Sequence, residues 1–150
     1  MTGEYRNTVD DKGRLMIPPK IREQLGTVTE LVLTKSPFDT LWLFTKTEFE
    51  KLSAAVSYGP LSMFNENARI LDMTVIAPAR EVELDKTGRL GIPQVLREYA
   101  GIEAKGECVI QGSRNHVEII SSEAYEAMMK SFKAKAPEAG NQLSMQRMGM

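Results

Sequence analysis

Short apolar runs separated by turn-forming residues set the pattern of this chain. The four most compact runs hold three or four residues each and are rich in strand-forming side chains; they cover residues 31–34, 41–44, 108–110 and 117–120. A turn-prone segment separates the first two runs, and a glycine-containing loop separates the last two. The pattern therefore predicts two pairs of adjacent β-strands.

Apolar residues at helical spacing follow both strand pairs. Thr45 to Glu48 fit a capping box, and the helix that they open is expected to stop at 57–60. A connecting helix is predicted over 61–77, and its apolar face consists of Leu61, Phe64, Ala68, Leu71 and Val75. A last helix opens at 121–123, with Tyr125, Met128, Met129 and Phe132 as its apolar positions. From about Ala134 this period is lost, so we expect a mobile tail.

One segment of the chain occurs twice. Residues 10–18 and 85–93 share the frame Asp-x-x-Gly-Arg-Leu-x-Ile-Pro, and in both copies Arg-Glu and then Gly follow. Proline at the start and glycine at the stop predict a short helix after each frame, from Pro18 to Gly26 and from Pro93 to about Gly101. A strand is predicted just before the second copy, at 81–84.

Each copy of the frame is predicted to begin with a tight hairpin turn, here named the first tip (residues 10–14) and the second tip (residues 85–89). Aspartate can accept hydrogen bonds from the turn backbone, and glycine fits a left-handed turn position. The residues expected to support the two turns in this way are Asp10, Gly13, Asp85 and Gly88. Arg14 and Arg89 follow just past the turns, so the chain presents an arginine outward twice.

Composition limits the classes of function. The chain has 150 residues, of which 42% are hydrophobic and 26% charged, as in ordinary globular proteins. No apolar run approaches the roughly 18 residues of a membrane span, so we expect a cytoplasmic protein with no membrane partner. The formal net charge of −1 gives no support to a diffuse attraction to nucleic acid.

No cofactor, metal site or catalytic residue is expected. The lone cysteine, Cys108, lies in an apolar run and is predicted to be a buried strand residue. His116 is the only histidine, and because no second metal-binding side chain lies near it in the sequence, it is interpreted as a loop residue. The carboxylates of the first tip are not accompanied by an activated nucleophile, so an enzyme is not expected.

The duplication predicts the architecture. A copy made of two strands around a turn, a short helix, a strand pair and a helix has only about 45 residues, a size at which burial barely offsets chain entropy. We therefore expect an α+β, β-rich fold in which two half-domains form one pseudo-two-fold β core with flanking helices. The expected units are a first module at 4–49, connecting helices at 50–78, a second module at 79–124, and a helix with a mobile tail at 125–150.

The two frames, together with Gly3-Glu4-Tyr5, Leu41-Trp42-Leu43 and the 81–85 and 96–101 segments, resemble the MraZ family over residues 3 to about 130. The resemblance implies tandem AbrB-like swapped-hairpin modules assembled into a ring, with an octamer-like ring as the expected oligomer. It also implies a sequence-specific, nucleoid-associated transcriptional regulator. Family members bind short direct repeats in double-stranded DNA upstream of the division and cell-wall gene cluster, their own promoter included. Two departures lie outside the motif, namely Ile120, where many members carry a tryptophan, and the methionine-rich tail after residue 140.

Carried onto this sequence, the resemblance places Arg14 and Arg89 at the DNA face. Arginine can donate two hydrogen bonds to guanine O6 and N7 or hold a phosphate, and Lys12 and Lys86 beside them suit phosphate contact. The alternative for the two arginines is an ordinary surface ion pair with the aspartates of their tips. The basic residues expected to be exposed or paired with a neighbouring glutamate on the short helices are Lys20, Arg22 and Arg97.

Two further hypotheses remain open. An antitoxin-like protein would bind DNA and also hold a toxin, and a scaffolding ring would grip a protein with its tips. An antitoxin of this type usually devotes a long extended C-terminal segment to its partner, whereas here the second module is expected to run nearly to the end of the sequence, with only a short tail after it. A promoter fragment would displace a protein partner from the tips only if both used them.

Overall fold

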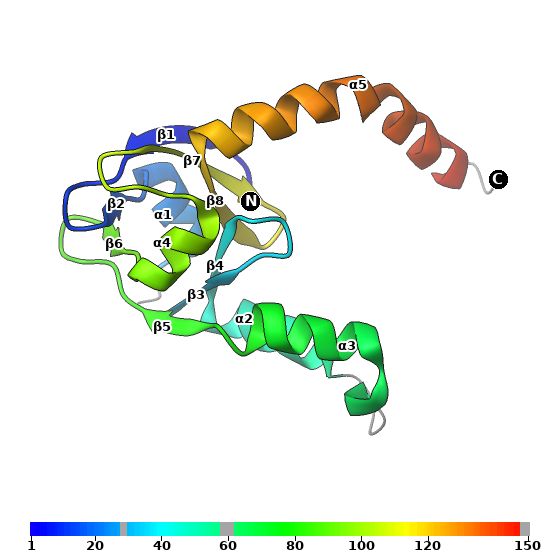
Figure 1. Ribbon diagram of the computed structural model, residues 1–150, viewed down its shortest axis with the longest axis horizontal. Helices are drawn as coiled ribbons and strands as arrows, with labels where there is room; N and C mark the ends of the chain where they lie inside the picture. The colour runs from blue at the N-terminus through cyan, green and yellow to red at the C-terminus, as the bar shows by residue number, and fades with distance from the viewer. Residues whose placement is uncertain (28–29, 58–61, 148–150) are drawn as a thin grey trace.

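The computed structural model describes residues 1–27, 30–57 and 62–147. Its strands are β1 (Glu4–Thr8), β2 (Arg14–Met16), β3 (Leu31–Lys35), β4 (Leu41–Thr45), β5 (Arg80–Val82), β6 (Arg89–Gly91), β7 (Glu107–Ser113) and β8 (His116–Ser121). Its helical segments are α1 (Pro19–Leu25), α2 (Lys46–Val56), η1 (Ser62–Phe64), α3 (Glu66–Leu71), η2 (Asp72–Ile76), α4 (Gln94–Ala100) and α5 (Ser122–Arg147). Figure 1 shows the α+β, β-rich fold that the sequence predicts.

Six of the strands form one antiparallel sheet in the order β1-β7-β8-β4-β3-β5. The first strand of each copy pairs with a strand of the other copy, because β1 lies against β7 and β5 lies against β3. Exchanging the two copies gives the same order read from the other edge, since β1 corresponds to β5, β3 to β7 and β4 to β8. A pseudo-two-fold axis therefore passes between β4 and β8.

The remaining strands, β2 and β6, form a separate two-stranded ribbon. Leu15 pairs with Leu90, its equivalent in the second copy, and Arg14 lies opposite Gly91. Leu15 and Leu90 are both fully buried. Because equivalent residues face each other only on a symmetry axis, this leucine pair marks the place where the pseudo-two-fold axis crosses the ribbon.

The structure corrects the hairpin predicted at each tip. The two strands that flank a tip, here called its arms, do not form a ladder with each other. The turn itself closes, since the Asp10 N–H donates to the Arg14 carbonyl at 2.9 Å. Beyond the turn the arms separate: β1 joins the six-stranded sheet, and β2 joins β6. In the second copy a single bridge links Leu84 to Leu90. Alternation of apolar and polar residues specifies which face of a strand is buried, and not which strand lies beside it.

The hydrophobic core lies between the inner face of the six-stranded sheet, the β2–β6 ribbon and the short helices α1 and α4. Its innermost members are fully buried and come from all of these elements except α4: Leu15, Ile17, Ile21, Leu33, Leu41, Leu43, Leu90, Ile110, Val117 and Ile119. Helix α4 adds Leu96, which is also buried. Cys108 lies among them, as predicted. Burial raises the pKa of its thiol to about 12, so the thiol is protonated at neutral pH.

Three of the predicted helices are confirmed at their starts or stops. Helix α1 begins at Pro19 directly after Pro18, and it stops at Gly26, whose φ is +82°. Helix α4 begins after Pro93 and stops at Gly101. The predicted cap of α2 forms, because the Glu48 N–H donates to Thr45 Oγ1 at 3.3 Å. The predicted stop of α2 at 57–60 lies mostly outside the described residues.

The predicted connecting helix over 61–77 is broken into η1, α3 and the π-helical η2. Its end packs against the body, where Val75 is buried and accepts a hydrogen bond from Thr34 Oγ1 at its carbonyl. Phe64, by contrast, is 79% exposed. Leu61 lies outside the described residues. The predicted apolar face is therefore covered only in part within one chain, because the segment mostly projects from the body of the molecule, as Figure 1 shows for α3.

The segment expected to be a mobile tail is helical as far as Arg147, because residues 134–147 continue α5. All of these residues are exposed, and three of them are alanines, the residue with the highest helix propensity: Ala134, Ala136 and Ala139. An exposed helix needs no apolar period, so the loss of the period did not mark the end of this one; the mobility of the segment stays a prediction. Among the described residues, no helix has both the length and the apolar character needed to cross a membrane.

The leucine pair on the pseudo-two-fold axis gives a stability prediction. Leu15→Ala is expected to lower the free energy of unfolding by about 2–5 kcal/mol, because it leaves a cavity where the ribbon meets the core. Val95→Ala is the control, since Val95 is 54% exposed on α4 and its truncation should cost within about 0.5 kcal/mol. Urea unfolding of both variants measures the difference, and equal effects would contradict the assigned position of Leu15.

Candidate nucleic-acid interface

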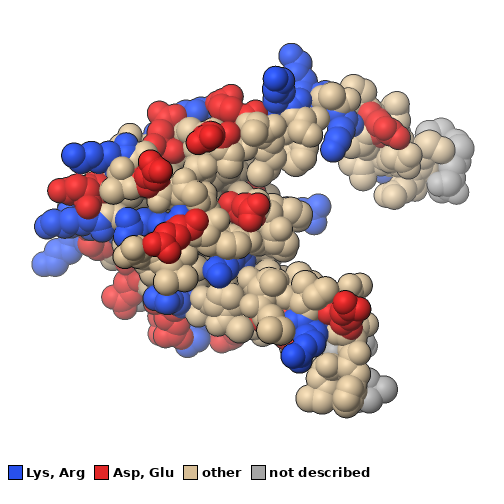
Figure 2. All heavy atoms as spheres, in the orientation of Figure 1, with Lys and Arg blue, Asp and Glu red and all other residues tan. Residues whose placement is uncertain are grey.

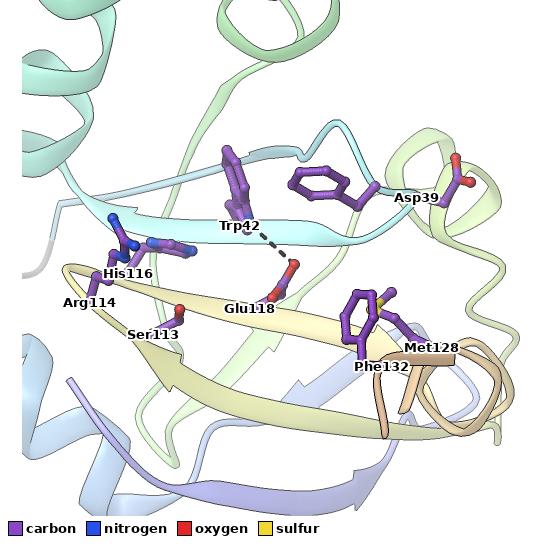
Figure 3. Close-up of a pocket in the computed structure, with 9 residues that line it drawn as sticks. Asp39, Trp42, Ser113, Arg114, His116, Glu118, Met128 and Phe132 are labelled. Carbon is purple, nitrogen blue, oxygen red and sulfur yellow. Dashed lines mark hydrogen bonds between the residues drawn. The ribbon is translucent and has the colours of Figure 1, made fainter. Parts of the chain in front are cut away.

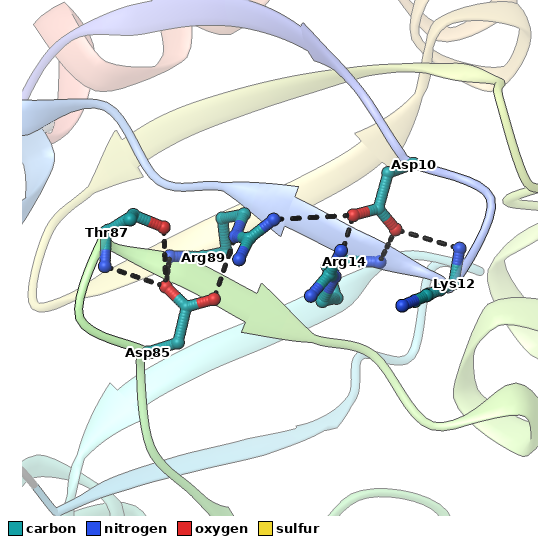
Figure 4. Close-up of polar contacts among 6 residues, drawn as sticks. All are labelled: Asp10, Lys12, Arg14, Asp85, Thr87 and Arg89. Atoms are coloured by element: carbon teal, nitrogen blue, oxygen red, sulfur yellow. Dashed lines mark hydrogen bonds and ion pairs between the residues drawn. The ribbon is translucent and has the colours of Figure 1, made fainter.

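The first tip is closed by the carboxylate of Asp10. Its Oδ1 accepts hydrogen bonds from the backbone N–H of Lys12 at 2.9 Å and of Arg14 at 2.8 Å. Its Oδ2 accepts from Arg14 Nε at 2.7 Å. Gly13 has a φ of +79°, which a residue with a Cβ rarely adopts. One carboxylate therefore shapes the turn and also orients the arginine, as Figure 4 shows.

The second tip repeats this arrangement around Asp85. The backbone N–H groups of Thr87 and Arg89 donate to Asp85 Oδ1 at 3.0 and 2.9 Å, and Arg89 Nε donates to Oδ2 at 2.8 Å. The Thr87 hydroxyl adds a bond to Oδ1 at 2.8 Å. Gly88 has a φ of +89°. The predicted supporting roles of the aspartates and glycines are therefore consistent with the geometry of both turns.

These hydrogen bonds lower the pKa of both aspartates. The Arg14 backbone N–H is the main cause that lowers the pKa of Asp10, with a further contribution from the Arg14 side chain. The pKa of Asp85 is lowered far below its ordinary value, mainly by the backbone N–H of Arg89. Each charged carboxylate binds its arginine at Nε and leaves the terminal Nη groups to other partners.

The pairing of β2 with β6 brings the two tips together. Arg89 Nη1 lies 3.9 Å from Asp10 Oδ2, so an arginine of one tip reaches the carboxylate of the other. The side chains of Arg14 and Arg89 are each 33% exposed. Figure 2 shows lysine and arginine side chains gathered at the end of the molecule where β2 and β6 lie in Figure 1. Two tips far apart in the sequence therefore form one surface.

The two lysines predicted to grip phosphate are not equivalent. Lys12 corresponds in the second copy to Thr87, and Lys86 corresponds in the first copy to Asp11. Both lysines are exposed. The Thr87 side chain is bound to Asp85, whereas the hydrogen bond of Lys12 to Asp10 comes from its backbone. The tips thus share one framework and differ in the charges that they expose.

Arg22 and Arg97 are placed differently from the sequence prediction. Both are half-buried, and their Nε atoms donate to the carbonyls of Ile17 and Ile92 at 3.0 and 2.9 Å. Lys20, by contrast, is paired with a glutamate of its own helix, as expected. One sequence signal could have indicated that these two arginines have equivalent roles. Each of them follows the tip glycine of its copy by nine residues.

A second surface feature is a groove on the outer face of the sheet, shown in Figure 3. Its volume is about 690 Å³. Its lining comes from the β3–β4 loop, β4, the end of β7, the turn after it, β8 and α5: Phe38, Asp39, Trp42, Ser113, Arg114, His116, Glu118, Met128 and Phe132. Glu118 accepts hydrogen bonds from Thr40 Oγ1 at 2.6 Å and Trp42 Nε1 at 3.2 Å. Aromatic and methionine side chains thus surround a carboxylate that is held in place.

His116 corrects the prediction of a plain loop residue. It begins β8, and its ring centroid lies 5.0 Å from that of Trp42 and 5.1 Å from that of Phe44. Burial is the main cause that lowers the pKa of its imidazole. Within residues 1–27, 30–57 and 62–147, no group of three or more His, Cys, Asp or Glu side chains is arranged to hold a metal ion.

The lowered carboxylate pKa values lead to a pH prediction. Since the pKa of Asp10 is lower in the folded protein than in the unfolded chain, its contribution to stability is present above about pH 4 and is lost as the pH falls through the folded-state pKa. Carbon-13 NMR of the side-chain carboxyl should give a midpoint below the ordinary value of 3.8. Arg14→Ala should keep much of this depression, because the backbone N–H remains. A midpoint at or above 3.8 in the parent protein would contradict the geometry of the turn.

Comparisons with known proteins match the chain along nearly its whole length. The family model described as "MraZ protein, putative antitoxin-like" matches residues 1–73 and again residues 75–147. The transcriptional regulator MraZ of Treponema denticola is 40% identical over 143 residues, which cover 95% of this chain and 96% of the relative. Proteins of the same name are 39% identical in Ligilactobacillus salivarius, over 83% of each chain, and 36% identical in Herpetosiphon aurantiacus, over 95% of each chain. These names denote a regulator and not an enzyme, in agreement with the prediction. The chain belongs to the MraZ family.

Proposed function

We propose that this chain is a sequence-specific DNA-binding transcriptional regulator. Its targets are short direct repeats upstream of the division and cell-wall gene cluster, including its own promoter. The observation that carries the proposal is the pair of aspartate-anchored arginines, Arg14 and Arg89, on one surface at one end of the molecule. The names of the relatives support a regulator of transcription.

The chemistry of the anchored arginines suits base recognition. Each aspartate holds the Nε atom of its arginine, which fixes the plane of the guanidinium. The Nη atoms at the outer end can then donate two hydrogen bonds to O6 and N7 of a guanine in the major groove, the commonest specific contact of arginine with DNA. A fixed guanidinium also loses less side-chain entropy on binding than a free one.

The formal net charge of −1 does not argue against DNA binding if the charge at the tips is positive. The basic side chains of the tips are Lys12, Arg14, Lys86 and Arg89. The acidic side chains of the tips are fewer, namely Asp10, Asp11 and Asp85. Because interactions between exposed charges are screened beyond roughly 8–10 Å, the local excess and not the net charge governs contact with phosphates.

We further propose that the modules are AbrB-like and that copies assemble head to tail into an octamer-like ring. The helical arm of residues 62–76 carries exposed apolar side chains, among them Phe64, Ile70 and Met73. The groove lined by Phe38 and Phe132 offers a different apolar surface on the same chain. Two different complementary patches make a heterologous contact, which closes into a ring if the rotation permits. Subunits related in this way present their tips in one orientation, as direct repeats require.

The reading role is tested by replacing each arginine. Arg14→Ala and Arg89→Ala should each reduce affinity for the upstream repeats by about tenfold or more, since a good bidentate pair contributes about 1–3 kcal/mol of discrimination and the ring repeats the loss. Arg147→Ala is the matched control, because it removes an arginine at the far end of α5. Titration by fluorescence anisotropy measures all three variants. If both tip variants bound the repeats like the parent protein, the proposed role of Arg14 and Arg89 in base recognition would be refuted.

The proposed contact of Lys12 and Lys86 with phosphate is tested by measuring DNA affinity over a series of salt concentrations. Two or three engaged subunits predict a slope of log affinity against log salt of roughly −4 to −8. Lys12→Ala should make this slope shallower for specific and unrelated DNA alike, and Lys86→Ala should act in the same way. Arg14→Ala should chiefly remove the preference for the specific site. If the lysine and arginine variants behaved identically, phosphate contact and base recognition would not be divided between the two residue types.

The ring is tested by light scattering at micromolar concentration. The parent chain should have the mass of an oligomer, and Phe64→Ser should lower that mass because it removes an apolar side chain that is 79% exposed in one chain. Val95→Ser is the matched control, since Val95 is an exposed apolar residue outside both the arm and the groove. A monomeric parent protein would contradict the ring.

A further inference from the structure

The two half-buried arginines of the short helices each contact the tip of the opposite copy. Arg22 belongs to the first copy, yet its guanidinium lies against Gly88 of the second tip, where a Cβ would lie 2.5 Å from Arg22 Nη1. Arg97 belongs to the second copy and lies against Gly13 of the first tip, where a Cβ would lie 2.7 Å from Arg97 Cζ. The contact is thus reciprocal and follows the pseudo-two-fold axis.

Backbone hydrogen bonds join the same groups. The Ile17 N–H donates to the Gly88 carbonyl at 3.0 Å, and the Ile92 N–H donates to the Gly13 carbonyl at 3.0 Å. Arg22 Nε binds the carbonyl of Ile17, and Arg97 Nε binds the carbonyl of Ile92. Each arginine therefore holds the residue that is hydrogen-bonded to the opposite tip, and its guanidinium packs on that tip as well.

We propose that Arg22 and Arg97 are positioning residues, each of which holds the opposite tip in the conformation needed to contact DNA bases. Arg97 sets the first tip and hence Arg14, and Arg22 sets the second tip and hence Arg89. The proposal rests on the proposed DNA-binding function and adds to it a coupling between the two copies. The glycines of the tips then have two reasons to lack a side chain, a positive φ and an occupied Cβ position.

The alternative role for these arginines is direct contact with a phosphate. Their Nε atoms are engaged by backbone carbonyls, and, unlike those of Arg14 and Arg89, their guanidinium groups also pack on the tip glycines, where a Cβ would lie 2.5 Å from Arg22 Nη1 and 3.0 Å from Arg97 Nη1. Lys20, on the same helix as Arg22, has a side chain that is 73% exposed and better placed for an unaided phosphate contact. The two roles differ in the free protein, because only a positioning residue affects the tip before DNA binds.

Hydrogen exchange of the DNA-free protein tests the crossed contact. In Arg97→Lys, the peptide 9–16 of the first tip should exchange about tenfold faster, because the guanidinium no longer packs on Gly13 and no longer holds Ile92, whose N–H donates to the Gly13 carbonyl. The peptide 84–91 should change clearly less, since it is coupled to the first tip only through the β2–β6 ladder. Arg22→Lys should give the reverse pattern. Lys20→Ala is the control and should leave both peptides unchanged. Faster exchange in neither tip, in both equally, or in the tip of the same copy would overturn the proposal.

A double-mutant cycle on the upstream repeats completes the test. If Arg97 acts through Arg14, Arg97→Lys should weaken binding by about tenfold in the parent and by less than about twofold in Arg14→Ala, whereas its effect should persist in Arg89→Ala. Full additivity with Arg14→Ala would show a direct contact and overturn the positioning role. Failure of the proposed function would look different, because Arg14→Ala alone would then bind like the parent.

Discussion

The pairing of strands between the two copies is the constraint on which the rest of the structure depends. The first strand of each copy lies beside the third strand of the other copy, and the second strands pair with each other through Leu15 and Leu90. A copy of about 45 residues could not bury this much apolar surface alone. The same pairing that completes the core also brings the two tips side by side.

This constraint bears on how a chain with a net charge of −1 could form the DNA surface that we propose. The strand pairing brings the basic residues of the two tips together at one end of the molecule, where Figure 2 shows lysine and arginine side chains interspersed with acidic ones. Within each tip the aspartate removes part of the local positive charge, yet it fixes the Nε side of the arginine and leaves the Nη atoms to other partners, one of which, for Arg89, is Asp10 of the other tip. The aspartates therefore orient the arginines and, in exchange, weaken the nonspecific attraction of the tips to phosphate.

Much of the fold could be predicted from the sequence because its signals are local. The short helices follow from proline and glycine at their ends, and the aspartate and glycine of each tip follow from turn chemistry. The sequence predicts the β3–β4 and β7–β8 pairs, which the structure confirms. It does not predict the partners of β1, β2, β5 and β6, because both copies carry the same alternation and the pattern does not distinguish them. The contacts of Arg22 and Arg97 with the opposite tips depend on that partner choice, so they were hidden as well. The helix at 134–147 was missed because exposed helices need no apolar period.

The central claim, that the tips read guanine in the major groove, is tested most directly by substituting 7-deazaguanine for single guanines in the upstream repeats. This base lacks the N7 acceptor but keeps O6 and Watson–Crick pairing, so it removes one of the two bonds of a bidentate arginine. Our account predicts that affinity falls by about fivefold or more at the guanines read by Arg14 and Arg89, and that the same substitution has no further effect on the variant lacking the arginine concerned. Unchanged affinity at every guanine of the repeats would contradict it.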